Sequence, residues 1–322
     1  MPVPTNFAAQ LEAFVQEWKA AQASSSDWAY RGGDPFPHFV WTDPGDSWQA
    51  CLDWLNELQG SWCFRGQRES SWNLDTSLDR AVLVARRDGS YHLNRQAEEQ
   101  EMLFHFRQQA HLHVRHVPAA DDLASWLAMM QHYGVPTRLL DWTTSPYVAL
   151  YFSLVDEPSE THAALWALDL AWLNSRETHD ALAGLEQMNQ LLHATDRFVI
   201  VRIEPSMTSD RMAAQQGLLL AKGIPEATFS QMLISMMSHP EVVNRPVVRR
   251  LEVDKSLRTE VLQRLRDMNI HSASLFPGLD GFARFLKVGL EIKTRLAAAA
   301  ASTTGWRPAA SGVMHDSPEP RP

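Results

Sequence analysis

The segment at residues 131–152, QHYGVPTRLLDWTTSPYVALYF, sets polar and charged side chains inside a frame of apolar ones. A buried polar group is costly unless it has a hydrogen-bond partner, so these groups either satisfy one another or face a ligand. Ser145 suits the N-cap of a helix, and Pro146 suits its first position. We therefore expect a helix to begin at this point. Capping alone explains the pattern, and so does a helix N-terminus that receives an anion.

Composition and charge limit the classes of protein to which the chain belongs. It has 322 residues, of which 45% are hydrophobic and 21% are charged, as in globular proteins. A formal net charge of -9 argues against nucleic-acid binding, which needs a basic face, although it leaves room for a local basic cleft. No run of 18 apolar residues predicts a membrane span, and the N-terminus does not look like a secretory signal. We expect a cytoplasmic protein whose cysteines, Cys51 and Cys63, are reduced and packed.

Hydrophobic periodicity predicts an α+β fold, with one or more mixed sheets surrounded by helices. Strands are expected at 62–64, 163–170, 197–205 and 247–253, and helices at 7–18, 48–58, 94–112, 121–133, 256–270 and 282–296. We divide the chain into an N-terminal helical segment and flap at 1–60, a main domain at 61–290, and a disordered tail at 300–322.

The motif FRGQ places Arg65 at the end of an apolar run, followed by Gly66, which permits the close approach of another group. An arginine keeps its charge in a protein, so it must be paired or bound to a ligand. One interpretation is an ion pair with a helix carboxylate such as Glu98, Glu99 or Glu101. The other is a fork that binds the phosphate or carboxylate of a ligand.

The histidines of the chain do not predict a metal site. Those of HLHVRH at 111–116 do not share one helical face, and no cysteine or acidic cluster accompanies them. His132 and Tyr133 are more informative because they adjoin Arg138 and Asp141, although a satisfied core histidine is the better single explanation of His132. The Walker loop, the glycine-rich dinucleotide fingerprint, the nucleophile elbow and the paired-cysteine zinc pattern are all absent from the sequence, which removes most familiar enzyme classes.

Several segments together resemble the FRG domain family. They are FRGQRESSWNLDTSLDR, EEQEMLFHFRQQA, WLAMMQHYGVPTRLLDWTTSPYVALYFSL, RMAAQQG and LFPGLDGFARFL, and they follow one another from about Trp62 to Leu286. The family is named for its Phe-Arg-Gly motif. The resemblance implies a shared fold more than a particular reaction.

A second resemblance is to ADP-ribosyltransferases of the Arg, Ser, Glu type, and it implies an ADP-ribosyltransferase-like core. Residues 64–66 look like the aromatic-Arg-Gly strand end of these enzymes, and residues 143–145, followed by Ala149, look like their Ser-Thr-Ser strand. The resemblance implies that Arg65 anchors the pyrophosphate or ribose of NAD, and that Ser145 fixes the nicotinamide half.

The third element of these enzymes, a glutamate, has no clear counterpart in this sequence. The candidates are Gln215, Glu226, Glu252 and Asp280. A glutamine can hydrogen-bond a ribose but brings no negative charge, which amounts to several kcal/mol in a dry site.

These observations give one leading hypothesis and one alternative. In the first, NAD is a substrate, no cofactor is required, and a cleft formed by Arg65, the 131–145 loop and Asp280 transfers ADP-ribose to an acceptor that the sequence does not identify. The expected catalytic residues are Arg65, Ser145, Gln215 and Asp280, and the expected ligand-binding residues are Arg65, Gly66, His132, Tyr133, Arg138, Asp141, Trp142 and Thr144, with Tyr133 or Trp142 stacked on the nicotinamide ring. The alternative is a non-catalytic interaction domain in which Arg65, His132, Arg138 and Asp141 form one buried polar network.

Overall fold

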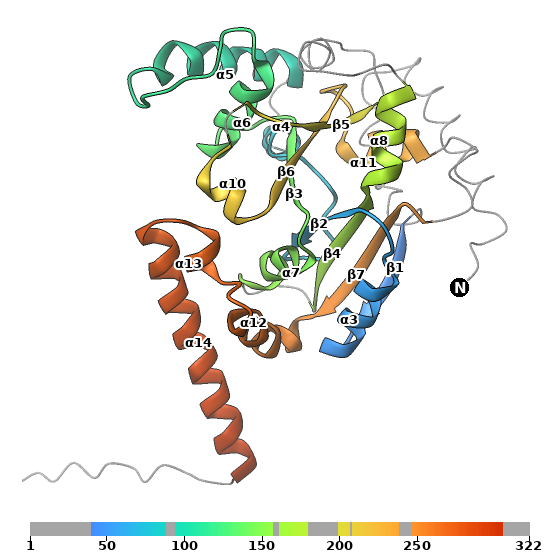
Figure 1. Cartoon of the computed structure of the whole chain (residues 1–322), viewed down its shortest axis with the longest axis vertical. Helices are drawn as coiled ribbons and strands as arrows, with labels where there is room; N and C mark the ends of the chain where they lie inside the picture. The colour runs from blue at the N-terminus through green and yellow to red at the C-terminus, as the bar shows by residue number, and fades with distance from the viewer. Residues whose placement is uncertain are drawn as a thin grey trace, which may run out of the picture.

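A computed structural model describes residues 40–87, 94–156, 161–179, 199–206, 208–237 and 246–304. Its centre is a seven-stranded sheet in the order β1-β7-β4-β2-β3-β6-β5 (Figure 1). The strands are β1 (Trp41–Gly45), β2 (Trp62–Gln67), β3 (Leu139–Thr143), β4 (His162–Asp169), β5 (Ile200–Ile203), β6 (Gly217–Lys222) and β7 (Val248–Asp254). Strands β1 and β7 run parallel, whereas the other neighbouring pairs in this sheet are antiparallel. The predicted α+β fold with a mixed sheet is confirmed.

Helices cover both faces of this sheet. They are α3 (Trp48–Glu57), α4 (Ser77–Arg87), α5 (Arg95–Ala110), α6 (Leu123–His132), α7 (Pro146–Leu154), α8 (Leu170–His179), α10 (Asp210–Ala214), α11 (Phe229–Met237), α12 (Arg258–Asp267), α13 (Ser272–Leu275) and α14 (Leu279–Thr304). One buried apolar cluster joins α6, α8 and α11 to the sheet, and a second joins α3, α7 and α12 to it. Strand β4 contributes alternate residues to the two clusters, as expected of a strand buried on both faces.

The elements expected from periodicity are present wherever the structure describes the chain. These are β2, β4, β5 and β7 among the strands, and α3, α5, α6, α12 and α14 among the helices. The helix expected at 7–18 lies outside the described residues. Strand β1, expected as part of a flap, pairs with β7 over five residues, and β6 was not expected because its apolar run GLLLAK does not alternate.

The sheet divides into two parts at β2 and β3. These strands share one register pair, Phe64 with Thr143, whereas β2 pairs with β4 over six residues and β3 with β6 over five. Beyond Phe64 the two strands separate, so the main-chain groups that face the gap lack the neighbour that a continuous sheet would provide. This fork, between Arg65–Gln67 of β2 and Leu139–Trp142 of β3, positions the candidate site.

Buried charges fasten the helices to the second part of the sheet. Lys222 is fully buried on β6, and its Nζ donates to Asp79 Oδ1 at 2.5 Å and to two main-chain oxygens. Arg138, at the start of β3, donates through Nε to Glu99 of α5 at 2.5 Å. Removing one partner of such a pair leaves an uncompensated charge in the core, so these pairs are structural.

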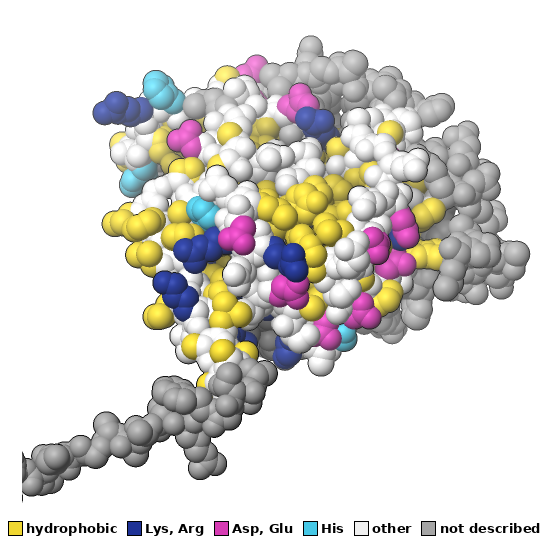
Figure 2. All heavy atoms as spheres, turned by 60° about the horizontal axis from the view of Figure 1, so that its bottom comes forward, with side chains coloured by type: hydrophobic (Ala, Val, Ile, Leu, Met, Phe, Trp, Pro, Cys, Tyr) yellow, Lys and Arg dark blue, Asp and Glu magenta, His cyan; other side chains and the backbone are white. Residues whose placement is uncertain are grey.

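Helix α14 extends beyond the rest of the structure at its C-terminal end (Figure 1). It continues to Thr304, past residue 300 where the tail was expected to begin, and residues 305–322 lie outside the described residues. In the part of the chain that the structure describes, no helix has both the length and the apolar character needed to cross a bilayer. On the face shown in Figure 2, basic and acidic side chains are interspersed with apolar ones, without a continuous basic field.

Candidate functional site

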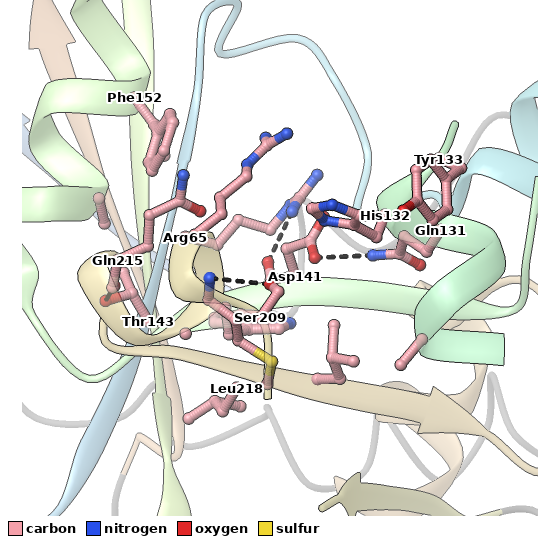
Figure 3. A pocket seen from close by; sticks show the side chains of 18 of the residues that line it. Arg65, Gln131, His132, Tyr133, Asp141, Thr143, Phe152, Ser209, Gln215 and Leu218 are labelled. Atoms are coloured by element: carbon pink, nitrogen blue, oxygen red, sulfur yellow. Dashed lines mark hydrogen bonds between the residues drawn. The ribbon is translucent and has the colours of Figure 1, made fainter. Parts of the chain in front are cut away.

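A cavity of about 1190 Å³ lies at the fork between β2 and β3. Its walls come from β2 and the loop that follows it, the C-terminal end of α6, β3, α7, α10 and the start of β6. In Figure 3, Arg65 lies between Gln215 and Phe152 on one side and Gln131 and His132 on the other. The cavity is larger than most small-ligand pockets, which measure roughly 300–1000 Å³.

The Phe-Arg-Gly motif forms the fork because its side chains alternate across β2. Phe64 is buried in the cluster that includes α7, and Gly66 faces the same helix. A Cβ on residue 66 would lie 1.9 Å from the main-chain oxygen of Ala149, so only a glycine lets α7 pack this closely. Arg65 lies between them in sequence and therefore points to the opposite face.

Arg65 bridges the fork and has most of its hydrogen-bonding capacity unused. Its Nη1 donates to the main-chain oxygen of Asp141 at 2.6 Å, and its buried Nε has no partner among the described residues. Burial lowers the pKa of this guanidinium to about 10; the nearby charge of Asp141 opposes the shift, and that of Arg80 adds to it. The predicted ion pair with Glu98, Glu99 or Glu101 is wrong, because Glu99 binds Arg138 instead.

The cavity is more basic than the chain as a whole. Five arginines and three aspartates line it, with no lysine or glutamate in the lining. Arg80 donates to the main-chain oxygen of Asp75 at 2.7 Å, and Arg211 lies 4.8 Å from the ring centre of Phe276. Such a concentration of guanidinium groups favours an anionic ligand.

Asp141 is held by a chain of hydrogen bonds that begins in the core. Its Oδ1 accepts from Gln131 Nε2 at 2.7 Å (Figure 3). Gln131 Oε1 in turn accepts from Thr137 Oγ1 at 2.6 Å. Thr137 is fully buried, and its main-chain nitrogen donates to Ser77 Oγ at 3.0 Å. The Asp141 carboxylate is therefore positioned before any ligand arrives.

Gln215 is the C-cap of α10 and lies two residues before β6, beside the end of β3. Its Nε2 donates to the main-chain oxygen of Leu275 at 3.0 Å, and its own main-chain oxygen accepts from Thr143 Oγ1 at 2.7 Å. The side-chain oxygen of Gln215 accepts no hydrogen bond from a described residue. The Phe-Arg-Gly strand β2 and the hydroxyl-rich strand β3 are neighbours in the sheet, and Gln215 lies just before β6, the next strand after β3.

A family model described as the FRG domain matches residues 60–162. The chain contains an FRG domain. The matched residues of the FRG domain include β2, β3 and α7, and therefore Arg65, Gln131 and Asp141. Arg211 and Gln215 lie outside the match, although they line the same cavity. No curated protein and no solved structure gave a significant match to the chain.

Seven of the residues predicted for the site line this cavity of the FRG domain. They are Arg65, Gly66, His132, Tyr133, Asp141, Trp142 and Gln215. Tyr133 is 58% exposed and available for stacking, whereas Trp142 is buried and packs near Phe229. The role of each of these residues stays a prediction.

The remaining predicted residues, Arg138, Thr144, Ser145 and Asp280, do not line the cavity. Arg138 is buried and paired with Glu99, and the single polar network of the alternative hypothesis stays a prediction. Thr144 is exposed and bonds at 3.5 Å to the main chain of Gln216. Asp280 is exposed on α14. Its placement was not predicted because the sequence does not reveal how that helix packs against the rest of the chain.

Ser145 is the N-cap of α7, and its hydroxyl accepts from the main-chain nitrogen of Val148 at 3.3 Å. Pro146 has no N–H to offer, so the first turn of α7 is closed by its own cap. Capping therefore accounts for the Thr-Ser-Pro sequence, and the anion receptor at this helix start stays a prediction.

Sequence reasoning missed Arg68, Arg80, Arg211, Trp72 and Phe152 as lining residues. Arg68 follows Arg65 by three positions, and Arg211 belongs to the RMAAQQG segment, so both had a signal in the motifs themselves. Arg80 and Trp72 had none, because Trp72 in the loop after β2 and Arg80 on α4 reach the cavity only through tertiary packing.

The described residues contain no group of three or more His, Cys, Asp or Glu side chains that could hold a metal ion. Cys51 and Cys63 are unpaired and buried, as predicted, and burial raises the pKa of the Cys51 thiol to about 11. Neither thiol is suited to act as a nucleophile near neutral pH.

Proposed function

We propose that the FRG domain binds NAD in the cavity at the fork, with the pyrophosphate on Arg65. The observation that carries the proposal is the Arg65 guanidinium, which makes one hydrogen bond to a main-chain oxygen and leaves a buried Nε without a described partner. A half-buried cation with unused donors favours an anion, and a diphosphate offers several acceptor oxygens to a planar fork.

The neighbouring charges support an anion more strongly than a neutral ligand. Burial lowers the pKa of Arg65 and the charge of Arg80 lowers it further, because the two cations repel one another. A bound diphosphate would relieve this repulsion. The acidic balance of the whole chain does not oppose such a ligand, because the cavity walls are locally basic.

Aromatic side chains at the cavity suit the two ring systems of NAD. Trp72 and Tyr133 are 45% and 58% exposed, a large apolar area to leave in water. The Arg68 guanidinium lies 5.1 Å from the ring centre of Trp72, which leaves Trp72 beside a positive charge. A nucleobase and a nicotinamide ring are the parts of the ligand that would stack there.

Transfer of ADP-ribose is the finer part of the proposal. The nicotinamide C–N bond would break with its electron pair leaving on nicotinamide, and a lone pair of the acceptor would form the new bond while the acceptor proton passes to solvent. Gln215 offers the sugar cation a carbonyl dipole rather than a negative charge. We therefore expect NAD to bind well and to be cleaved slowly.

Isothermal titration with NAD tests the binding step, with Arg65→Ala as the test variant and Arg264→Ala as the control. Arg264 is exposed on α12 and pairs with Glu260 there, remote from the cavity lining. Loss of charge-assisted hydrogen bonds worth about 1.5–3 kcal/mol should weaken binding roughly 10- to 100-fold in the first variant and not in the second. Nicotinamide release, measured in the same samples, tests transfer.

Failure of the wild-type protein to bind NAD, or equal binding by Arg65→Ala, would remove the proposal. Binding without nicotinamide release would leave a nucleotide-binding domain and remove the transfer step alone.

A further inference from the structure

The Asp141 carboxylate is held in a fixed position by a neutral side chain, that of Gln131. One carboxylate oxygen accepts from Gln131 Nε2 at 2.7 Å, and within 4.0 Å the carboxylate has no ion pair with a described basic residue. The side chain is exposed to the cavity that five arginines also line. By contrast Asp156, another aspartate of the cavity, is paired with Arg284 at 2.6 Å.

Gln131 determines how this carboxylate lies. Both ends of its amide are engaged, because Oε1 accepts from Thr137 Oγ1 at 2.6 Å while Nε2 donates to Asp141. The Thr137 hydroxyl also accepts from the main-chain nitrogen of Leu139 at 3.3 Å, which leaves its proton directed at Gln131. The amide therefore has one orientation, and the second carboxylate oxygen is left for a ligand.

Arg65 and Asp141 face each other across the fork. Arg65 Nη1 is 2.6 Å from the main-chain oxygen of Asp141. The Arg65 guanidinium, which can bind phosphate, therefore lies close to the Asp141 carboxylate, which can only accept hydrogen bonds. A 5′-nucleotide presents the complementary pair, a phosphate next to a ribose whose 2′- and 3′-hydroxyls are donors. No other part of NAD offers two neighbouring hydroxyl donors to a carboxylate.

We infer that Asp141 accepts hydrogen bonds from the diol of the adenosine ribose, which carries the additional phosphate in NADP, that Gln131 is its positioning residue, and that the site selects against a 2′-phosphate. This inference rests on the proposed function and names its substrate class, a nucleotide with free ribose hydroxyls. A 2′-phosphate would lose one donor and place its negative charge against the carboxylate.

The cavity arginines and Asp141 have opposite effects on the affinity for NADP. Judged by the arginines alone, NADP should bind the cavity more tightly than NAD, because it carries an additional phosphate. Only a correctly placed negative charge reverses that order. A preference for NAD over NADP therefore reports on Asp141 and not on the basic character of the cavity.

Titrations of NAD and NADP into matched variants provide the test. We expect the wild-type protein to bind NAD at least tenfold more tightly than NADP, and Asp141→Asn to bind NADP at least as tightly as NAD. Gln131→Leu should lower the preference in the same direction because the carboxylate is no longer held. Asp156→Asn removes another cavity carboxylate and should leave the ratio of the two affinities unchanged.

The outcomes separate the inference from the function on which it rests. If NAD binds through Arg65 but Asp141→Asn keeps the wild-type ratio, the inference is wrong and the proposed function stands. If neither nucleotide binds the wild-type protein, both are wrong. Far-ultraviolet circular dichroism and thermal melting of each variant identify any loss of fold, and in that case the Gln131→Leu ratio decides.

Discussion

Replacing Gly66 by alanine tests the close packing that forms the fork. The new Cβ would lie 1.9 Å from the main-chain oxygen of Ala149 and 2.6 Å from the main-chain nitrogen of Ser153. Non-bonded atoms need about 3.5 Å, so α7 would have to move away from β2 by roughly 1.5 Å. Both obstacles are main-chain atoms of a helix, so no side-chain rotation removes them.

The expected cost follows from this displacement. Overpacking a well-packed core costs typically about 1–3 kcal/mol, and a clash with a whole helix belongs at the upper end of that range or above it. At roughly 2 °C per kcal/mol, the melting temperature should fall by about 6 °C or more. Because α7 supplies Ala149 and Phe152 to the cavity wall, NAD affinity should fall as well.

Urea unfolding of Gly66→Ala and of a glycine control measures the effect. Gly217→Ala is the control, because its Cβ would lie 3.1 Å from the flexible side chain of Met212 and 3.2 Å from its main-chain oxygen. We expect the control to lose less than half as much stability. A Gly66→Ala protein within about 1 kcal/mol of the wild type would show that α7 adjusts freely, and the steric reason for the glycine would be wrong.

Two further predictions concern His271, the N-cap of α13, and Gln215, the C-cap of α10. Burial and the charge of Arg266 lower the pKa of His271 below its ordinary value of 6.5, so the unfolded chain binds the proton first and the stability of the fold should fall as the pH falls. In thermal melts between pH 7.5 and 5.0, the melting temperature of His271→Asn should fall less steeply, and this variant keeps an acceptor for the Ser274 N–H. Equal slopes for the two proteins would contradict the prediction. Gln215→Glu places a negative charge beside the proposed sugar cation and should raise the rate of nicotinamide release at least tenfold with little change in NAD affinity. We expect this gain even though the new carboxylate faces the main-chain oxygen of Leu275. An unchanged rate would remove Gln215 from the transfer step.

The sequence predicted the parts of the fold that depend on local pattern. Alternation and helical periodicity located β2, β4, α5 and α6, and the residues around Ser145 located the start of α7. It did not predict β6, because a strand buried on both faces reads as a plain apolar run.

The candidate site could be predicted only in part, because its residues come from distant segments. The family resemblance drew attention to Arg65, Asp141 and Gln215, which the structure brings to one cavity. Arg138 lies three residues before Asp141, yet a buried glutamate 39 positions earlier in the chain removes it from the cavity. Such a pairing leaves no local pattern in a single sequence.

The single register pair between β2 and β3 also has a mechanical consequence. The sheet has two parts, one of four strands and one of three, that meet edge to edge at Phe64 and Thr143. A ligand bound to Arg65 on β2 and to Asp141 on β3 would connect the two parts of the sheet across this junction. Without ligand, we expect the main-chain amides of β2 and β3 at this junction to exchange with deuterium faster than the amides of the neighbouring strands. When a ligand connects Arg65 and Asp141, the exchange of these amides should slow together.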